Sequence, residues 1–119
     1  MKIYVSHSKE IDFANDLYKP LRESGLDKLH TFVLPHEGQK SLNVKKTLKD
    51  YDLVIAEVSI PATGQGIELG WADMLGVPIL CVSREGNEKS KSLKYVTDKF
   101  LTYKDSNDLV AKISEFLSK

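Results

Sequence analysis

The residues best suited to chemistry lie in one segment, YDLVIAEVSIPATGQGIELGWADMLGVPIL, at positions 51–80. Its pattern predicts an apolar strand, a loop rich in proline and glycine, and then a helix whose first turn carries Glu68. In an open α/β sheet, ligands bind beyond the carboxyl ends of the strands, where this loop would lie. A lone carboxylate there, beside backbone N–H groups exposed by Gly64 and Gly66, is well placed to act on a bound ligand as an anion. The alternative is that Glu68 only complements the dipole of its helix.

Five short apolar runs predict the strands that would position this carboxylate. They are Lys2–Ser6, Thr31–Leu34, Leu53–Val58, Pro78–Val82 and Lys99–Tyr103. Longer segments with helical periodicity alternate with them, which is typical of a parallel sheet covered by helices on both faces. We therefore predict one α/β domain over residues 1–119, a three-layer sandwich with a mostly parallel, flavodoxin-like sheet of about five strands.

The helical segments have recognisable ends. Apolar residues at helical spacing between positions 11 and 21 predict a helix ended by Gly25, and Pro20 predicts a kink or break near Tyr18–Lys19. Residues 42–50 predict a lysine-rich helix facing water, and residues 67–75 predict a helix ended by Gly76. Ser106 is expected to cap the last helix.

Composition limits the partners of the chain. Seventeen Lys and Arg balance seventeen Asp and Glu, so no bulk charge directs it to nucleic acid or anionic lipid. No apolar stretch approaches the roughly 18 residues that span a bilayer, and the N-terminal residues turn polar too early for a signal peptide. We therefore expect a cytoplasmic protein with no membrane partner. Cys81 is the only cysteine, which suits a reducing compartment, and the spacing of the three histidines predicts no metal site.

The run AEVSIPATGQGIELGWA resembles the signature of the nucleoside 2-deoxyribosyltransferase-like superfamily, which includes the 2′-deoxynucleoside 5′-phosphate N-hydrolases. The resemblance covers roughly residues 2–103, is strongest over 52–72, and has further support in KIYVS, FVLPHE and GVPILCV. It implies hydrolysis or transfer at the N-glycosidic bond of a nucleoside or its 5′-monophosphate, with Glu68 as a nucleophile that forms a covalent glycosyl-enzyme. It also implies that Tyr4 orients this carboxylate and that no cofactor is needed. The helix dipole and nearby N–H groups would lower the pKa of Glu68.

The same resemblance implies substrate-binding residues around the sugar or the phosphate, namely Ser8, Gly64 and Gly66, with Thr63 beside Ala62, which stands at the position of the family's loop serine. Ser59, at the end of the strand, is expected to reach the site as well. Glycine-rich turns of this kind form anion-binding sites from backbone N–H groups. A further serine, contributed by the partner subunit in the family, matches Ser92, with Ser90 as the alternative. The resemblance therefore implies a homodimer with shared sites.

Two departures from the family pattern bear on activity. A Gly-Ser pair and an arginine follow the first strand in the hydrolases, whereas this chain has His7, Ser8, Lys9 and Glu10. The family also places an aspartate on the helix before the AEV strand, where it serves the leaving base, and that position is Val44 here. His36, at the end of the second strand, is the best substitute general acid because imidazole titrates near neutral pH. The alternative is that His36 is an ordinary loop residue.

Other interpretations stay open. The missing aspartate favours a domain of the same fold that binds a nucleotide without turning it over. YVSHSKE resembles the opening of Toll/interleukin-receptor-like domains, some of which cleave NAD while others assemble signalling complexes. Glu57, inside the third strand, is expected to have a partner such as a lysine or a backbone N–H, because an unpaired buried charge is costly. The C-terminal SEFLSK lacks the carboxamide that completes the site of the transferases, which favours hydrolysis over base exchange.

Overall fold

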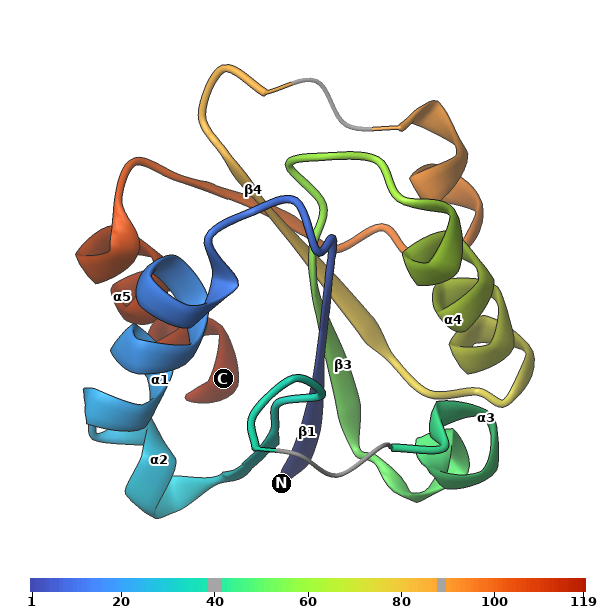
Figure 1. Cartoon of the computed structure of the whole chain (residues 1–119), viewed down its shortest axis with the longest axis horizontal. Coiled ribbons are helices and arrows are strands. Elements are labelled where there is room, and N and C mark those ends of the chain that lie inside the picture. The colour runs from blue at the N-terminus through green and yellow to red at the C-terminus, as the bar shows by residue number, and fades with distance from the viewer. Residues whose placement is uncertain (39–41, 88–89) are drawn as a thin grey trace.

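The sheet of this computed structural model, which describes residues 1–38, 42–87 and 90–119, has five parallel strands (Figure 1). They are β1 (Lys2–His7), β2 (Thr31–Val33), β3 (Leu53–Glu57), β4 (Ile79–Arg84) and β5 (Phe100–Tyr103). Their order across the sheet is β2-β1-β3-β4-β5, and every neighbouring pair is parallel. The predicted flavodoxin-like α/β sandwich is therefore confirmed.

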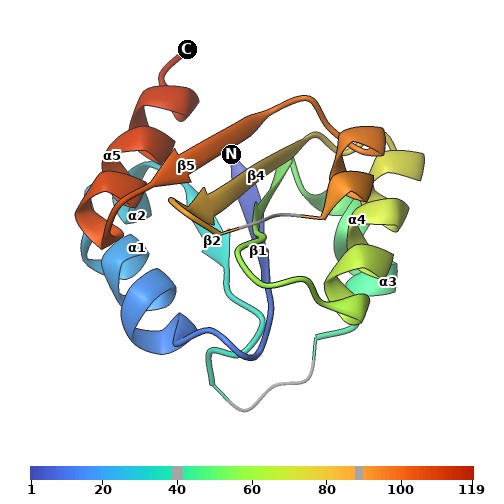
Figure 2. The same cartoon turned by 90° about the horizontal axis from the view of Figure 1, so that it is seen from above.

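Helices cover both faces of the sheet, as Figure 2 shows from above. One layer holds η1 (Ala14–Tyr18), α1 (Lys19–Glu23), α2 (Leu26–Leu29) and α5 (Ser106–Leu117), and the other holds α3 (Val44–Thr47), η2 (Leu48–Asp50), α4 (Thr63–Met74) and η3 (Lys91–Tyr95). Two apolar clusters follow because successive side chains of a strand point to opposite faces. Ile3 and Val5 of β1 pack in the cluster under α1 and α5, whereas Tyr4 packs in the cluster under α4. The sequence alternation of β1 thus determines which of its side chains can reach α4.

The first helical segment breaks where its proline predicts. The π-helical turn η1 ends at Tyr18, and α1 begins at Lys19 with Pro20 in its first turn. A proline lacks the N–H that an interior helical position would need, so it is tolerated at the start of a helix. The predicted break near Tyr18–Lys19 is confirmed.

Two helix starts differ from the prediction. α4 begins at Thr63, so Gly64 and Gly66 are helical residues and Glu68 does not lie on the first turn. α5 is capped by Asp105, whose carboxylate accepts a hydrogen bond from the N–H of Asp108. The predicted cap of α5 by Ser106 is wrong.

The segment over residues 42–50 also differs from the single water-facing helix predicted. It divides into the short α3 and the 3₁₀ turn η2, and Leu48 at their junction is fully buried under the sheet. The lysines of this segment face outward, but the segment itself is part of the apolar cluster under α4. It therefore forms a wall between the sheet and solvent.

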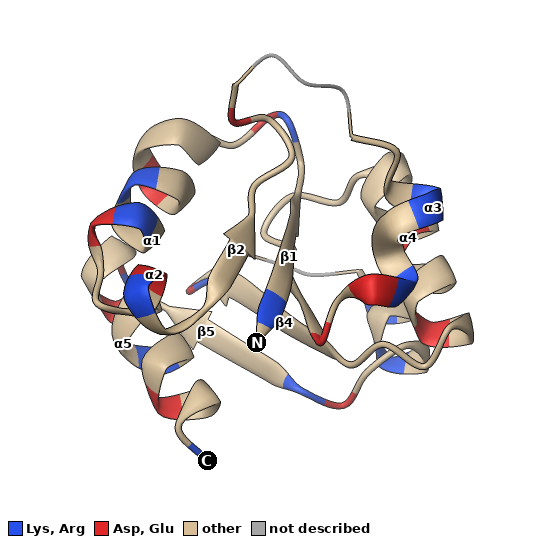
Figure 3. Ribbon diagram, turned by 90° about the horizontal axis from the view of Figure 1, so that it is seen from below, with Lys and Arg blue, Asp and Glu red and all other residues tan. Residues whose placement is uncertain are grey.

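Charges of both signs are interspersed on the helices of both layers (Figure 3). Among the described residues, no helix combines the length and the apolar character that crossing a bilayer requires. Within the same ranges, no group of three or more His, Cys, Asp or Glu side chains is arranged to hold a metal ion.

Candidate active site

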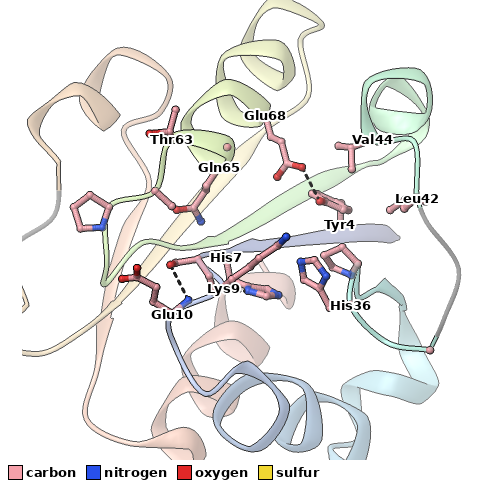
Figure 4. Close-up of a pocket in the computed structure, with 16 residues that line it drawn as sticks. Tyr4, His7, Lys9, Glu10, His36, Leu42, Val44, Thr63, Gln65 and Glu68 are labelled. Carbon is pink, nitrogen blue, oxygen red and sulfur yellow. Dashed lines mark hydrogen bonds between the residues drawn. The ribbon is translucent and has the colours of Figure 1, made fainter.

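A half-buried carboxylate, Glu68, lines a cavity of the described structure (Figure 4). The hydroxyl of Tyr4 donates to Oε2 of Glu68 over 3.1 Å, and the hydroxyl of Ser6 donates to Oε1 over 3.1 Å. Each carboxylate oxygen is thus held by one hydroxyl of β1. Two separate donors restrain the carboxylate more tightly than one donor would.

The local sequence explains why these groups meet. Tyr4 and Ser6 are two residues apart on β1, so both point to the face that α4 covers. The Tyr4 ring stacks on Tyr51, with ring centroids 5.3 Å apart and an interplanar angle of 21°. Leu69, next to Glu68 on α4, is buried in the same cluster and fixes the helix against the sheet. Glu68 is therefore held on a packed helix face.

Burial controls the ionisation of this carboxylate. Desolvation raises the pKa of Glu68 above its ordinary value, and the hydrogen bonds from Tyr4 and Ser6 oppose that rise. The expectation that the helix dipole lowers this pKa is wrong, because Glu68 lies beyond the first turn of α4 and has lost part of its water. Burial and the neighbouring carboxylate raise the pKa of Tyr4, so its phenol stays protonated and remains a donor.

The cavity has a volume of about 940 Å³ and, besides Tyr4 and Glu68, is lined by four groups of residues. The end of β1 and the segment after it contribute His7 to Glu10, the segment after β2 contributes Pro35, His36 and Gly38, and α3 with its approach contributes Leu42 and Val44. The start of α4 and the preceding loop contribute residues 61–65. The site therefore lies at the carboxyl edge of β1 and β3, where the order of the strands reverses and such sheets commonly bind ligands.

The start of α4 forms the polar end of the cavity. Its N-cap, Ala62, provides no side-chain acceptor, and the first turn carries no acid. The leading N–H groups of a helix lack partners inside the helix, so they are available to an anion. Gly64 has no positive φ, and the donors here are those of a helix start instead of the glycine-rich turn predicted. Thr63, Gly64 and Ser8 all line this cavity.

The His7 and Tyr18 side chains form a hydrogen-bonded cluster with two backbone groups at the other wall of the cavity. Nε2 of His7 lies 2.6 Å from the Tyr18 hydroxyl, and Nδ1 of His7 lies 2.8 Å from the carbonyl oxygen of Ser8. A carbonyl only accepts, so Nδ1 carries the proton and the Tyr18 hydroxyl donates to Nε2. The Tyr18 oxygen in turn accepts the backbone N–H of His36 over 3.1 Å. Both ring nitrogens of His7 are therefore used within the protein.

Both histidines at the cavity are held in the neutral form. Burial lowers the pKa of His7, and burial together with the positive charge of Lys9 lowers the pKa of His36. The segment that carries His36 is fixed by Arg22, whose guanidinium donates to both carboxylate oxygens of Glu37 over 2.7 and 2.9 Å. His36 thus lines the cavity as predicted, but as a neutral ring.

Ser59 lies away from Glu68. It lines a separate cavity of about 350 Å³ and its N–H and hydroxyl both donate to Glu57, over 2.6 and 3.0 Å. The Tyr103 hydroxyl donates to Glu57 as well. Glu57 has the backbone N–H partner that its burial predicts, and by alternation it points to the face of the sheet opposite Glu68. This network holds the loop after β3 and connects it to β5.

Ser92 and Gly66 line a third cavity, of about 400 Å³, on the far side of the start of α4. Ser90, the alternative to Ser92, lines it too. The described residues of one chain thus bring together Glu68, Tyr4, His36, Ser8, Thr63 and Gly64, and they leave Ser59, Gly66 and Ser92 outside the main cavity.

Sequence reasoning missed Ser6, Gln65 and the role of Tyr18. Ser6 lies two residues after Tyr4 on a strand, and this spacing was the available signal that both face the same helix. Gln65 is buried, and its side-chain amide donates to the carbonyl oxygen of Glu57 over 2.9 Å. It therefore ties the start of α4 to the end of β3.

Comparison with known proteins gives partial sequence matches and full-length structural ones. No protein-family model matches the chain. The 5-hydroxymethyl-dUMP N-hydrolases of Mus musculus and Rattus norvegicus are each 54% identical to it over 37 residues, or 31% of this chain. The matched segment spans only 21% and 23% of the length of these relatives.

Two solved structures resemble the whole domain. A CMP N-glycosidase from Clostridium botulinum aligns over 96% of this chain and 99% of its own, with a TM-score of 0.67 and 21% identity. A 2-deoxyribosyltransferase from Bacillus psychrosaccharolyticus aligns over 92% of this chain and 90% of its own, with a TM-score of 0.59 and 21% identity. At this identity the likeness establishes the fold. The proteins matched are those that the AEV…ELG segment predicts.

Proposed function

We propose that this chain is a member of the nucleoside 2-deoxyribosyltransferase-like superfamily and cleaves the N-glycosidic bond of a nucleoside 5′-monophosphate. The observation that carries the proposal is the Glu68 carboxylate, gripped by Tyr4 and Ser6 and open to a cavity of about 940 Å³. The partial match to N-hydrolases of a nucleotide and the full-length likeness to an N-glycosidase support the same activity.

In the proposed reaction, Glu68 attacks C1′ of the sugar. The carboxylate first stabilises the positive charge that develops at C1′ and then bonds to it, giving a glycosyl-enzyme ester as the base departs. Water hydrolyses the ester and restores the carboxylate. Tyr4 and Ser6 orient the two oxygens of Glu68 so that one lone pair faces the sugar. No cofactor takes part in these steps.

The polar end of the cavity suits the 5′-phosphate. The leading N–H groups of α4, the Thr63 hydroxyl and the Ser8 hydroxyl form a group of donors, and the helix dipole favours negative charge at this point. A phosphate bound there would leave the sugar over Glu68. We assign Thr63, Gly64 and Ser8 to this role.

We further propose a homodimer, because the family completes its site with a serine from the partner subunit. Ser92 lies beside the start of α4, at the third cavity, and not at Glu68 of its own chain. Light scattering would give the mass of the particle in solution. A dimer in which Ser92→Ala raises KM for monophosphates would support the assignment, and a monomer with full activity would contradict it.

The activity is tested by incubating the protein with nucleosides, their 5′-monophosphates and NAD, followed by chromatographic detection of free base. We expect base release from monophosphates by the wild type and a loss of at least about 1,000-fold in Glu68→Gln, since a nucleophile has no substitute. Glu10→Gln, which changes the other carboxylate lining the described cavity, is the matched control and should lose less than about tenfold, equivalent to 1.36 kcal/mol. Equal activity of wild type and Glu68→Gln would refute the proposed role.

A nucleotide that binds in calorimetry without any release of base would favour the sensor interpretation. NAD consumption without cleavage of monophosphates would favour the Toll-like one. Mass spectrometry after incubation with a 2′-fluoroarabinosyl nucleotide, whose glycosyl-enzyme hydrolyses slowly, would detect the adduct on the peptide that contains Glu68.

A further inference from the structure

The end of the cavity opposite the start of α4 is mostly apolar and carries few polar groups. Pro35, Leu42 and Val44 give it apolar walls, and His36 and Lys9 provide its polar groups. Figure 4 shows Val44, Leu42 and His36 on one side of Glu68 and Thr63 on the other. A nucleotide with its phosphate at α4 and C1′ at Glu68 would therefore place its base among these apolar walls.

Among the residues that the structure describes, this end of the cavity has no carboxyl group that could protonate the base. Among the described residues, the carboxylates that line the cavity are Glu68, the proposed nucleophile, and Glu10, which lies on the side of Thr63 and Gln65 (Figure 4). Val44 is a hydrocarbon at the position where the family has its aspartate.

The histidines do not replace that acid. His7 has both ring nitrogens bonded within the protein, to Ser8 and Tyr18. His36 is held neutral by burial and by the charge of Lys9, and a neutral imidazole is a very weak acid. The Lys9 side chain extends into the cavity on the side of His36, so among the described lining residues this end carries the positive charge of Lys9 (Figure 4).

We infer that this site releases its base without protonating it, and that it selects pyrimidine-2,4-diones, the uracil-type bases, which leave as stabilised anions. The inference rests on the proposed N-glycosidic cleavage. A dione spreads negative charge over N1 and its two carbonyl oxygens, where the Lys9 ammonium and a His36 N–H can stabilise it. Adenine and cytosine leave readily only when protonated, and the walls formed by Leu42 and Val44 offer no proton.

The step balances without an added acid. The Glu68 oxygen bonds to C1′, the C1′–N1 bond breaks, and its electron pair goes to the dione, which departs as an anion. The anion takes a proton from water after departure. A second water then hydrolyses the ester, which returns the Glu68 carboxylate and the sugar phosphate. A cationic base such as a pyridinium would also leave without an acid, but the charge of Lys9 opposes its binding.

The first test compares substrates that differ in the acidity of the base. With 5-fluoro-dUMP, dUMP, dTMP, dCMP, dAMP and nicotinamide mononucleotide, we expect kcat/KM to fall in the order 5-fluoro-dUMP, dUMP, dTMP. The rates for dCMP and dAMP should lie at least about 100-fold below that for dUMP, the lower limit of what a general acid typically contributes. Equal rates for dAMP and dUMP, or faster cleavage of nicotinamide mononucleotide than of dUMP, would overturn the inference.

The second test restores the acid. Val44 is only partly buried, so a polar side chain is tolerated there. Val44→Asp should raise kcat/KM for dAMP and dCMP at least about tenfold and weaken the dependence on base acidity, while Val44→Asn, of nearly the same size but without an acidic proton, should do neither. Equal effects of the two variants would overturn the inference.

The third test concerns the cation. Lys9→Gln should lower kcat/KM for dUMP at least about tenfold, and Lys9→Arg, which keeps the charge, should restore most of it. Failure of the inference is distinguishable from failure of the proposed function. In the first case monophosphates are cleaved in a manner that depends on Glu68 but not on base acidity, and in the second no base is released by Glu68 at all.

Discussion

Replacing Tyr4 by phenylalanine removes one of the two hydroxyls that hold Glu68 and leaves the aromatic ring in place. The ring remains stacked on Tyr51, at 5.3 Å between centroids, so the fold is expected to persist. The 3.1 Å hydrogen bond to Oε2 of Glu68 is lost. A hydrogen bond to a charged group is worth about 1.5–3 kcal/mol.

The effect on activity follows from the state of Glu68 that the hydroxyl stabilises. The bond favours the ionised carboxylate, so its loss raises the pKa of Glu68 further above the ordinary value and moves the acidic limb of the kcat/KM profile to higher pH. At pH values on the acidic limb, the kcat/KM of Tyr4→Phe should be about 10- to 150-fold lower than that of the wild type, which corresponds to the same 1.5–3 kcal/mol. At the plateau the loss should be smaller, because the bond also stabilises the resting carboxylate that must attack.

The assay is the pH profile of base release from a monophosphate by the wild type, Tyr4→Phe and Tyr51→Phe. Tyr51→Phe is the matched control because its hydroxyl donates to Thr47 over 3.2 Å and not to Glu68. The control should keep the acidic limb of the wild type. An acidic limb that stays in place in Tyr4→Phe, or that moves equally in both variants, would refute the reasoning.

Three further predictions concern other parts of the molecule. Tyr103→Phe removes a donor from buried Glu57 and should lower the free energy of unfolding by about 1.5–3 kcal/mol in urea titrations; an unchanged midpoint would mean that the hydroxyl contributes nothing. Burial lowers the pKa of His7 from 6.5, so the unfolded chain binds this proton at higher pH than the folded chain, and stability should fall as the pH drops below about 6.5. That fall should be weaker in His7→Gln, and an identical pH dependence of the melting temperature would contradict it. Gly64→Glu adds a negative charge where a Cβ meets no neighbour, and it should raise KM for monophosphates about tenfold or more but not KM for nucleosides, measured side by side.

Most of the fold could be predicted from the sequence because it depends on the spacing of apolar residues along strands and along helices. Short apolar runs alternate with helical segments, and this pattern favours the parallel sheet that the structure has. The start of α4 was predicted too late because Gly64 and Gly66 are typical of loops. Contacts across the fold decide otherwise, since the Gln65 side chain bonds to the end of β3 and Gly66 N–H bonds to the carbonyl oxygen of Ala62.

The chemistry of the candidate site could be predicted from the sequence, but which residues line it could be predicted only in part. Glu68 and Tyr4 are brought together as the resemblance implies. Ser59 was drawn toward Glu57 on the opposite face, because the direction of a side chain beyond a strand end depends on tertiary contacts that a pattern does not contain. Ser6 needed only the period of two along β1, but a small polar residue in an apolar strand gives a weak signal.

The two ends of this cavity differ in how firmly their side chains are held by the surrounding structure. The hydroxyls that hold Glu68 come from a central strand that is almost wholly inaccessible to water, where nearly any replacement would disturb the core. The apolar wall of the opposite end is formed by Pro35, Leu42 and Val44, and Val44 belongs to α3, a single turn that buries none of its own side chains completely. Substitutions on that turn should therefore cost little free energy of folding. Evolution can change the nucleobase that this end accepts while the residues around Glu68 stay unaltered.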